Sequence, residues 1–225
     1  MIKACLFDLD GVIVDTARYH FIAWRNLAND LGIDFDEKEN ENLKGVGRME
    51  SLEYILSLGG IYKSDHEKEL LAAKKNDQYK MLIEQIGPSE ILPGVEDFLG
   101  ELKSANILIG LGSSSKNARP VLSYLGIKTY FDVIVDGTDI SKSKPDPEVF
   151  IRGAEALSIA PSETVVFEDA RAGVEAARTG GFMSIGVGDP VELGIADHVI
   201  NGFVDFNLEK MKNILAVLVN YGQDQ

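Results

Sequence analysis

The stretch that decides the fold reads LFDLDGV over residues 6–12, at the end of an apolar run that begins at Ile2. Such a run predicts a buried strand, and two carboxylates two residues apart at its end project to the same side. Gly11 then allows the backbone a sharp change of direction. Crowded carboxylates repel unless a cation lies between them, so Asp8 and Asp10 are candidate ligands for Mg²⁺. Alone, these residues are equally consistent with a hydrated turn.

Short apolar runs alternate with amphipathic stretches of helical length along most of the chain. Several runs are apolar on both faces, as parallel strands covered by helices are. The alternation predicts an α/β fold with a doubly wound, mostly parallel, Rossmann-like sheet. The predicted strands are Lys3–Phe7, Ile107–Leu111, Val133–Val135, Thr164–Phe167, Met183–Val187 and, more weakly, His198–Ile200. The predicted helices are Val95–Ser104, Ala118–Leu125, Pro147–Leu157 and Arg171–Thr179.

The interval from Thr16 to Ile86 breaks this alternation, because it contains only helical patterns. Helices are expected over Thr16–Leu31, with Gly32 as a C-cap, over Met49–Leu58 and over Asp65–Ile86. We therefore expect a helical cap domain, residues 16–87, inserted into an α/β core domain of residues 1–15 and 88–225. The insert leaves the core near the C-terminal end of the first strand, where open α/β sheets bind ligands, so it is expected to act as a lid.

The composition excludes some classes of protein. The 225 residues are 45% hydrophobic and 26% charged, with a formal net charge of −14. This charge argues against nucleic-acid binding, which needs a basic face. The N-terminal apolar run is too short to span a membrane, and neither terminus resembles a signal peptide. A single cysteine, Cys5, rules out a disulfide framework, and a cytoplasmic location is expected.

Further polar residues follow other predicted strands. Parallel strands would bring all of these positions to one edge of the sheet, where carboxylates, hydroxyls and an ammonium group would meet. They comprise the acidic pair Glu168 and Asp169, the serine cluster Ser113, Ser114 and Ser115, and Lys144, which precedes a helix with proline in its first turn.

This set, in this order, resembles the haloacid dehalogenase-like superfamily of phosphotransferases over nearly the whole chain. The resemblance implies that Asp8 attacks the phosphoryl group and becomes an aspartyl phosphate. It implies that Asp10 serves as general acid and base. Mg²⁺ would be the cofactor, held by Asp8, the backbone carbonyl of Asp10 and Asp169, with Glu168 supporting the site.

The resemblance also implies that Ser113 and Lys144 neutralise and orient the transferring phosphoryl oxygens. Phosphoryl transfer is catalysed mainly by alignment and charge stabilisation, which suits this set of residues. Membership does not fix the substrate, because function depends on the site and the cap.

Three patterns in the insert bear on the substrate. His20 and Trp24 are four residues apart and share a helix face. Residues 43–48, LKGVGR, form a glycine-rich loop with two cations, and residues 74–79, KKNDQY, lie on a predicted helix. Taken singly, a surface histidine with a core tryptophan, a solvated loop and a charged helix face would explain them.

Together the three patterns resemble the cap of the β-phosphoglucomutase family. The resemblance implies that His20 and Lys75 assist Asp10 and couple cap closure to substrate binding. Arg48, with Lys116 and Asn117, would hold a second phosphate. The substrate-binding residues it implies are Thr16, His20, Trp24, Lys44, Gly45, Val46, Arg48, Lys75, Ser114, Ser115, Lys116 and Asn117. Gly47 stands where this family is expected to have serine, and the acidic loop 136–139 has no assigned role.

The resemblance implies a Mg²⁺-dependent interconversion of β-D-glucose 1-phosphate and glucose 6-phosphate, primed by glucose 1,6-bisphosphate. A mutase needs two phosphate sites and a lid that excludes water. Lys144 at one end, and Arg48 with Lys116 at the other, favour it. The alternatives are a phosphatase acting on a small sugar phosphate and, more remotely, a non-catalytic binding protein. We expect a monomer whose partners are small sugar phosphates, supplied by a disaccharide phosphorylase.

Overall fold

The computed structural model describes residues 2–43 and 46–223, with the backbone alone after residue 218. A six-stranded sheet in the order β3-β2-β1-β4-β5-β6 forms its centre, and every neighbouring pair is parallel. The expected α/β fold with a doubly wound parallel sheet is confirmed, and each predicted strand is present within one residue at either end. The strands are β1 (Ala4–Phe7), β2 (Leu108–Gly112), β3 (Val133–Val135), β4 (Thr164–Glu168), β5 (Met183–Val187) and β6 (His198–Ile200).

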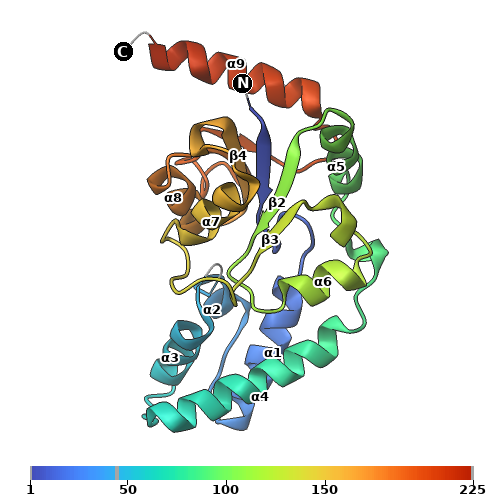
Figure 1. The fold of residues 1–225 in the computed structure, drawn as a ribbon. Helices are drawn as coiled ribbons and strands as arrows, with labels where there is room; N and C mark the ends of the chain where they lie inside the picture. Colours follow the sequence, from blue (N-terminus) through green and yellow to red (C-terminus); the bar gives the residue numbers. More distant parts are fainter. Residues whose placement is uncertain (1, 44–45, 224–225) are drawn as a thin grey trace.

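Helices cover both faces of the sheet, as Figure 1 shows. Alternate residues of β1 point to opposite faces, so Phe7 packs among residues of one helix group and Leu6 among those of the other. The first group contains α5 (Val95–Ser104), α6 (Ala118–Tyr124) and α9 (Leu208–Gln223). The second contains α7 (Glu148–Leu157) and α8 (Arg171–Thr179). This burial of both faces explains why the central strands β1 and β2 are apolar throughout.

The register of the central strands aligns their carboxyl ends. Phe7 pairs with Leu111 on one side and with Phe167 on the other. The Asp8 N–H donates to the Phe167 carbonyl at 2.9 Å. The residues that follow these three strands therefore emerge side by side at one edge of the sheet.

The remaining helices gather beyond that edge (Figure 1): α1 (Ala17–Asp30), α2 (Glu37–Glu41), α3 (Arg48–Leu58) and α4 (Asp65–Ile83). They have a hydrophobic cluster of their own, which includes Trp24, Leu27, Leu52 and Ile55. An inserted helical cap explains why these helices have a hydrophobic cluster separate from that of the core. The boundaries of the cap at residues 15/16 and 87/88 stay a prediction.

Two helices were not predicted, and one ends early. The sequence of α2 is EKENE, with no buried residue and no apolar period, and the Asp36 side chain caps it by accepting the Glu39 N–H at 2.9 Å. Helix α9 buries Met211 and Leu215, and their spacing of four is the sequence signal for this helix. Helix α4 ends at Ile83 rather than Ile86, because the chain turns before the glycine at 87.

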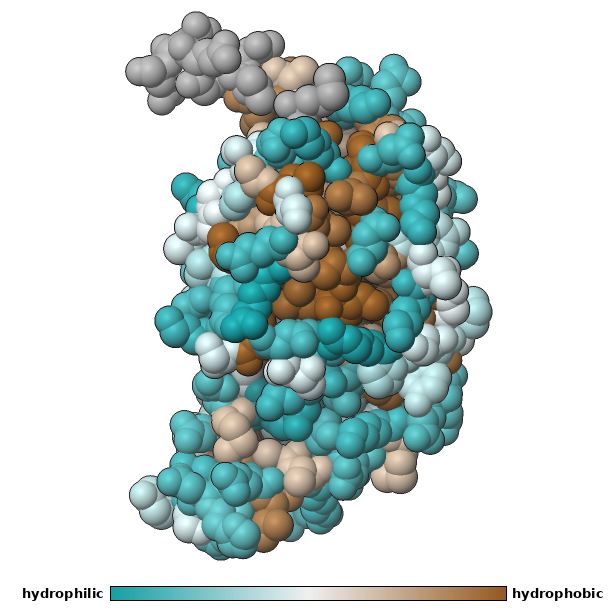
Figure 2. All heavy atoms as spheres, viewed as in Figure 1, coloured by the Kyte–Doolittle hydropathy of each residue, from teal (hydrophilic) through white to brown (hydrophobic). Residues whose placement is uncertain are grey.

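The surface differs between core and cap. Figure 2 shows apolar side chains gathered over β2 and β3, whereas the surface of the cap is mostly polar. Strand β3 lies at the edge of the sheet, which leaves Val133 and Ile134 half-buried. Within the described part of the chain, no helix combines the length and apolarity that a membrane crossing requires.

Candidate active site

Lys144 joins two carboxylates at the edge of the sheet. Its Nζ donates to Asp8 Oδ1 at 2.7 Å and to Glu168 Oε1 at 2.6 Å. Asp8 follows β1, Glu168 ends β4, and the loop after β3 supplies Lys144. Burial alone would lower the pKa of Lys144, but the charges of Asp8 and Glu168 raise it above the ordinary value. Lys144 therefore stays protonated and can neutralise phosphoryl oxygens.

The carboxylates of Asp8, Glu168 and Asp169 form a cluster that suits a divalent cation. Each offers an oxygen within 4.8 Å of the others. Burial raises the pKa of Asp169 well above its usual range, and the charges of Glu168 and Asp8 add to this. One lysine cannot neutralise three carboxylates, so a hard cation such as Mg²⁺ fits the donor set.

Glu168 has a supporting place within this cluster. Its second oxygen accepts the Ala170 N–H at 2.8 Å, so both of its oxygens already have partners. Asp8 and Asp169 would hold the metal most directly. The side chain of Asp10 lies outside the cluster of described carboxylates, and the role of its backbone carbonyl stays a prediction.

Two glycines explain why the sequence can crowd these side chains. Gly11 has φ +74°, and a Cβ there would lie 2.0 Å from Asp169 Oδ2. Gly173, in α8, would place a Cβ 1.7 Å from Glu168 Oε1. Both positions leave room only for hydrogen, so the glycines permit the close approach of the two acids.

Asp10 is a half-buried acid whose Oδ1 atom is enclosed by the protein. Its Oδ1 has no hydrogen-bond partner among the described residues. Burial, followed by the charge of Asp8, raises the pKa of Asp10 to about 8. A carboxyl group that keeps its proton near neutral pH can donate it to a leaving oxygen, which is the role predicted for Asp10.

His20 of α1 and Lys75 of α4 lie in contact in the cap. Lys75 Nζ lies 2.7 Å from His20 Nδ1 and 4.5 Å from the centre of the Trp24 ring. Burial, together with the charge of Arg48, lowers the pKa of Lys75 to about 7. Burial and then Lys75 lower the pKa of His20 well below its usual range. His20 is therefore neutral and accepts a hydrogen bond from Lys75 when that lysine is protonated.

Asn76 bridges the cap and the core. Its Oδ1 accepts hydrogen bonds from Arg48 Nη2 at 2.8 Å and from Asn117 Nδ2 at 3.0 Å. These donors come from α3 and from the loop before α6, while Asn76 lies on α4. Asn76 lies within the 74–79 motif but has no predicted role, because a contact across 41 residues leaves no local pattern in the sequence.

The serine loop is held by its own hydroxyls. The Ser113 N–H donates to the Val135 carbonyl at 3.1 Å, which extends the pairing of β2 with β3. Ser113 Oγ accepts the Ser115 N–H at 3.1 Å, and Ser115 Oγ accepts the Asn117 N–H at 3.2 Å. These oxygens order the loop, while the hydroxyl proton of the buried Ser113 remains available to a phosphoryl oxygen.

A cavity of about 420 Å³ between cap and core collects most of the predicted residues. Its volume falls in the range of small-molecule sites. Thr16 does not line it and is fully buried before α1, and Lys44 and Gly45 lie outside the described residues. The predicted residues that do line it are Asp8, Asp10, His20, Trp24, Val46, Arg48, Lys75, Ser113, Ser114, Ser115, Lys116, Asn117, Lys144, Glu168 and Asp169.

The wall of the cavity also accounts for Gly47. A Cβ at this position would lie 2.3 Å from Glu50 Oε2, so a serine would require the Glu50 side chain to move. Glu50 itself lines the cavity and was not predicted. Glu50 is exposed in the first turn of α3, and nothing in its sequence context distinguishes it from an ordinary surface acid.

Comparisons with known proteins agree with this geometry. The sequence model of a family described as haloacid dehalogenase-like hydrolase matches residues 2–181. The β-phosphoglucomutase of Bacillus subtilis is 45% identical over 209 residues, which cover 92% of each chain. A phosphorylated carbohydrates phosphatase of Thermotoga maritima is 33% identical, covering 81% of this chain and 83% of its own. The crystal structure of a β-phosphoglucomutase from Clostridium difficile superposes with a TM-score of 0.92 at 44% identity, covering 98% of this chain and 99% of its own.

Proposed function

The chain belongs to the haloacid dehalogenase-like hydrolase family, and on that premise we propose that it is a β-phosphoglucomutase. It is a Mg²⁺-dependent phosphotransferase that interconverts β-D-glucose 1-phosphate and glucose 6-phosphate. The similarity to two β-phosphoglucomutases over more than nine-tenths of the chain supports this activity over that of a phosphatase. Glucose 1,6-bisphosphate is the proposed priming intermediate.

The observation that carries the proposal is one cavity whose wall contains Lys144 beside Asp8 and two further cations, Arg48 and Lys116. Lys144 lies at the end that holds Asp8, and Arg48 and Lys116 also line the cavity. A sugar bisphosphate has two anionic ends, and each end must be bound in turn when the intermediate reverses. A phosphatase needs only the first of these sites.

Asp8 is the proposed nucleophile, because its carboxylate lies beside the Lys144 ammonium where a phosphoryl group would be neutralised. Asp10 would donate its proton to the oxygen that leaves and later remove a proton from the attacking hydroxyl. Ser113 would orient a phosphoryl oxygen by its hydroxyl. Asp8 and Asp169 would hold Mg²⁺, which would supply charge stabilisation for the transferring group.

The cap would exclude water from the aspartyl phosphate until a sugar hydroxyl arrives. Arg48 and Asn117 already meet at Asn76, which joins cap and core. Their guanidinium and amide donors suit the distal phosphate. His20 and Lys75 would assist Asp10 and couple closure of the cap to substrate binding. Trp24 and Val46 would contact the sugar ring.

The test uses purified protein with Mg²⁺, β-glucose 1-phosphate and a trace of glucose 1,6-bisphosphate. Glucose 6-phosphate and free phosphate are followed in the same tube, with the α anomer as control. Glucose 6-phosphate from the β anomer alone, with little free phosphate, is the expected result. Release of free phosphate in step with substrate loss would instead establish a phosphatase.

A further inference from the structure

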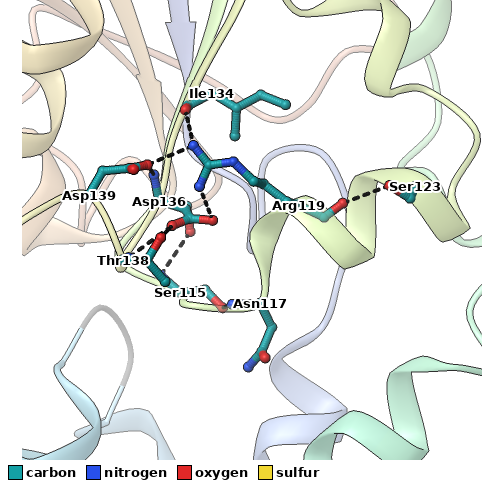
Figure 3. A network of polar contacts seen from close by, with 9 residues as sticks. Ser115, Asn117, Arg119, Ser123, Ile134, Asp136, Thr138 and Asp139 are labelled. Carbon is teal, nitrogen blue, oxygen red and sulfur yellow. Dashed lines mark hydrogen bonds and ion pairs between the residues drawn. The ribbon is translucent and has the colours of Figure 1, made fainter.

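Arg119 forms a network of polar contacts outside the cavity (Figure 3). This residue lies in the first turn of α6, two residues after Asn117. Its Nη1 pairs with Asp136 Oδ2 at 2.5 Å, and its Nη2 pairs with Asp139 Oδ2 at 2.8 Å. The same Nη2 donates to the Ile134 carbonyl at 2.7 Å. One guanidinium group thus holds the end of β3 and both acids of the loop that follows it.

The loop of residues 136–139 is tightly built around this guanidinium. The Asp136 side chain is only 3% exposed, and its Oδ1 accepts from the Thr138 N–H at 2.8 Å and the Thr138 hydroxyl at 2.6 Å. Asp139 Oδ2 also accepts the Asp136 N–H at 2.9 Å. Because a buried carboxylate requires a cationic partner, Asp136 depends on Arg119.

The same loop packs directly against the serine loop. The Gly137 N–H donates to the Ser115 carbonyl at 3.1 Å. A Cβ at Gly137 would lie 2.3 Å from the Ser114 carbonyl oxygen, so the two backbones touch. Residues 114–117 are therefore held on one side by the backbone of Gly137 and at their C-terminal end by Arg119, which follows them in the chain.

Lys144 has a separate set of anchors, although it follows the same loop. Its ammonium is fixed by Asp8 and Glu168. Glu148 holds the intervening chain by accepting the Ser141 N–H at 3.0 Å and the Lys142 N–H at 2.9 Å. Ser113, the other residue proposed to contact the transferring phosphoryl group, is held by its N–H bond to the Val135 carbonyl. The phosphoryl-transfer end of the cavity therefore has anchors that do not involve Arg119.

We propose that Arg119 is a positioning residue for the distal phosphate end of the cavity. It acts through Asp136 and Gly137, which fix the backbone that presents Lys116 and Asn117. Arg119 does not itself line the cavity. This inference rests on the proposed function, in which Lys116 and Asn117 bind the phosphate that is not being transferred.

The test compares two phosphoryl donors for Asp8 in the Mg²⁺-loaded enzyme, by rapid quench. Glucose 1,6-bisphosphate engages both ends of the cavity, whereas acetyl phosphate engages only the end that reacts. In Arg119→Ala, kcat/KM for phosphorylation by the bisphosphate is expected to fall about 10- to 100-fold. The loss should come mainly from a higher KM, because Lys116 and Asn117 would be displaced from the phosphate that they bind. The rate with acetyl phosphate should stay within about 3-fold, because the one residue of the serine loop that this donor would contact is Ser113, whose N–H is held by the Val135 carbonyl rather than through Gly137.

Lys3→Ala is the matched control, because this substitution also removes an ion pair, the exposed pair between Lys3 and Glu163. Lys3 lies just before β1. The variant should leave both donors unchanged. Arg119→Lys can pair with one acid only, so it should recover part of the lost affinity. Asp139→Asn removes one ion pair but keeps an acceptor for the Asp136 N–H, and it serves the test if Arg119→Ala fails to fold.

Equal losses with both donors would show that Arg119 supports the fold alone, and no loss with either would show that the distal end does not depend on it. Either result overturns the proposal. A wild-type enzyme that takes phosphoryl groups from both donors yet makes no glucose 6-phosphate would refute the mutase. The selective effect of Arg119 would still be measured in that case.

Discussion

Asp8 and Asp10 lie two residues apart and have opposite surroundings. Asp8 accepts a hydrogen bond from the charged Lys144, which keeps a carboxylate ready to attack. The Oδ1 atom of Asp10 is buried without a hydrogen-bond partner among the described residues, and the pKa of Asp10 is raised to about 8. Two carboxyl groups with different environments can divide the roles of nucleophile and general acid.

Asp10→Asn should lower phosphorylation of Asp8 by glucose 1,6-bisphosphate by about 10²- to 10⁴-fold, because the sugar oxygen then leaves without a proton. Acetyl phosphate should still label the variant, since acetate leaves readily without an acid. In the wild type, the rate with the bisphosphate should fall as the pH rises above about 8, where Asp10 loses its proton. Rapid-quench rates across pH check this, and a near-normal rate in the variant would remove Asp10 as the acid.

The residues found from sequence share a local signal. Asp8, Asp10 and Glu168 directly follow or end apolar strands, and the parallel sheet brings such positions together. Asn76 and Arg119 were not predicted, because their partners lie far along the chain. Asn76 belongs to a charged helical stretch, and Arg119 is the one charged residue of a short helix, so neither has a distinctive sequence signal. Their contacts depend on how loops and helices pack, which no local pattern encodes.

The helices of the core act as walls for the acidic cluster, and α8 shows this most clearly. Its N-terminal turn follows Asp169, and Gly173 faces Glu168 with no room for a Cβ. Helix α5 offers a matched position, because Gly100 lies inside a helix and a Cβ there would meet nothing within 4 Å.

Gly173→Ala should destabilise the protein by about 1–3 kcal/mol, because the added methyl group forces Glu168 to move. Gly100→Ala should stabilise it by about 0.5–1 kcal/mol, since alanine is the better helix former. Urea unfolding of the two variants beside the wild type gives both values. Equal effects would show that Glu168 has room to adjust and that the close packing is not a constraint.

Element prediction succeeded where the sequence has a mostly apolar run of strand length or an apolar helical period. The strands at Val133–Val135 and Met183–Val187 and the helix at Val95–Ser104 were predicted with their observed bounds. Helix α2 has no apolar face, so its formation depends on the Asp36 cap and its own charges. Periodicity cannot detect such a helix.

At the scale of the whole molecule, the cap and the core share the cavity. Arg48 of the cap and Asn117 of the core donate to one oxygen of Asn76. The sequence predicted an inserted lid from its position after the first strand. It could not predict how the lid sits, because side-chain contacts between distant segments fix that placement.

Arg48→Ala should lower kcat/KM for β-glucose 1-phosphate about 10-fold or more, because the guanidinium group binds the distal phosphate. Hydrolysis of a simple aryl phosphate should change less than about 3-fold, since this substrate has no distal phosphate. Arg25→Ala is the control on the same cap, where Arg25 is exposed and lies over the Phe21 ring. Equal losses on both substrates in Arg48→Ala would contradict a distal role.

The measurement that tests the account most directly is the fate of the phosphoryl group on Asp8. The enzyme is phosphorylated with labelled donor, freed of excess donor, mixed with unlabelled β-glucose 1-phosphate and quenched at short times. We predict that the label passes to glucose 1,6-bisphosphate and then to glucose 6-phosphate faster than to free phosphate, and that Asp8→Asn takes up no label. Label that appears chiefly as free phosphate, or that persists in Asp8→Asn, would contradict the account.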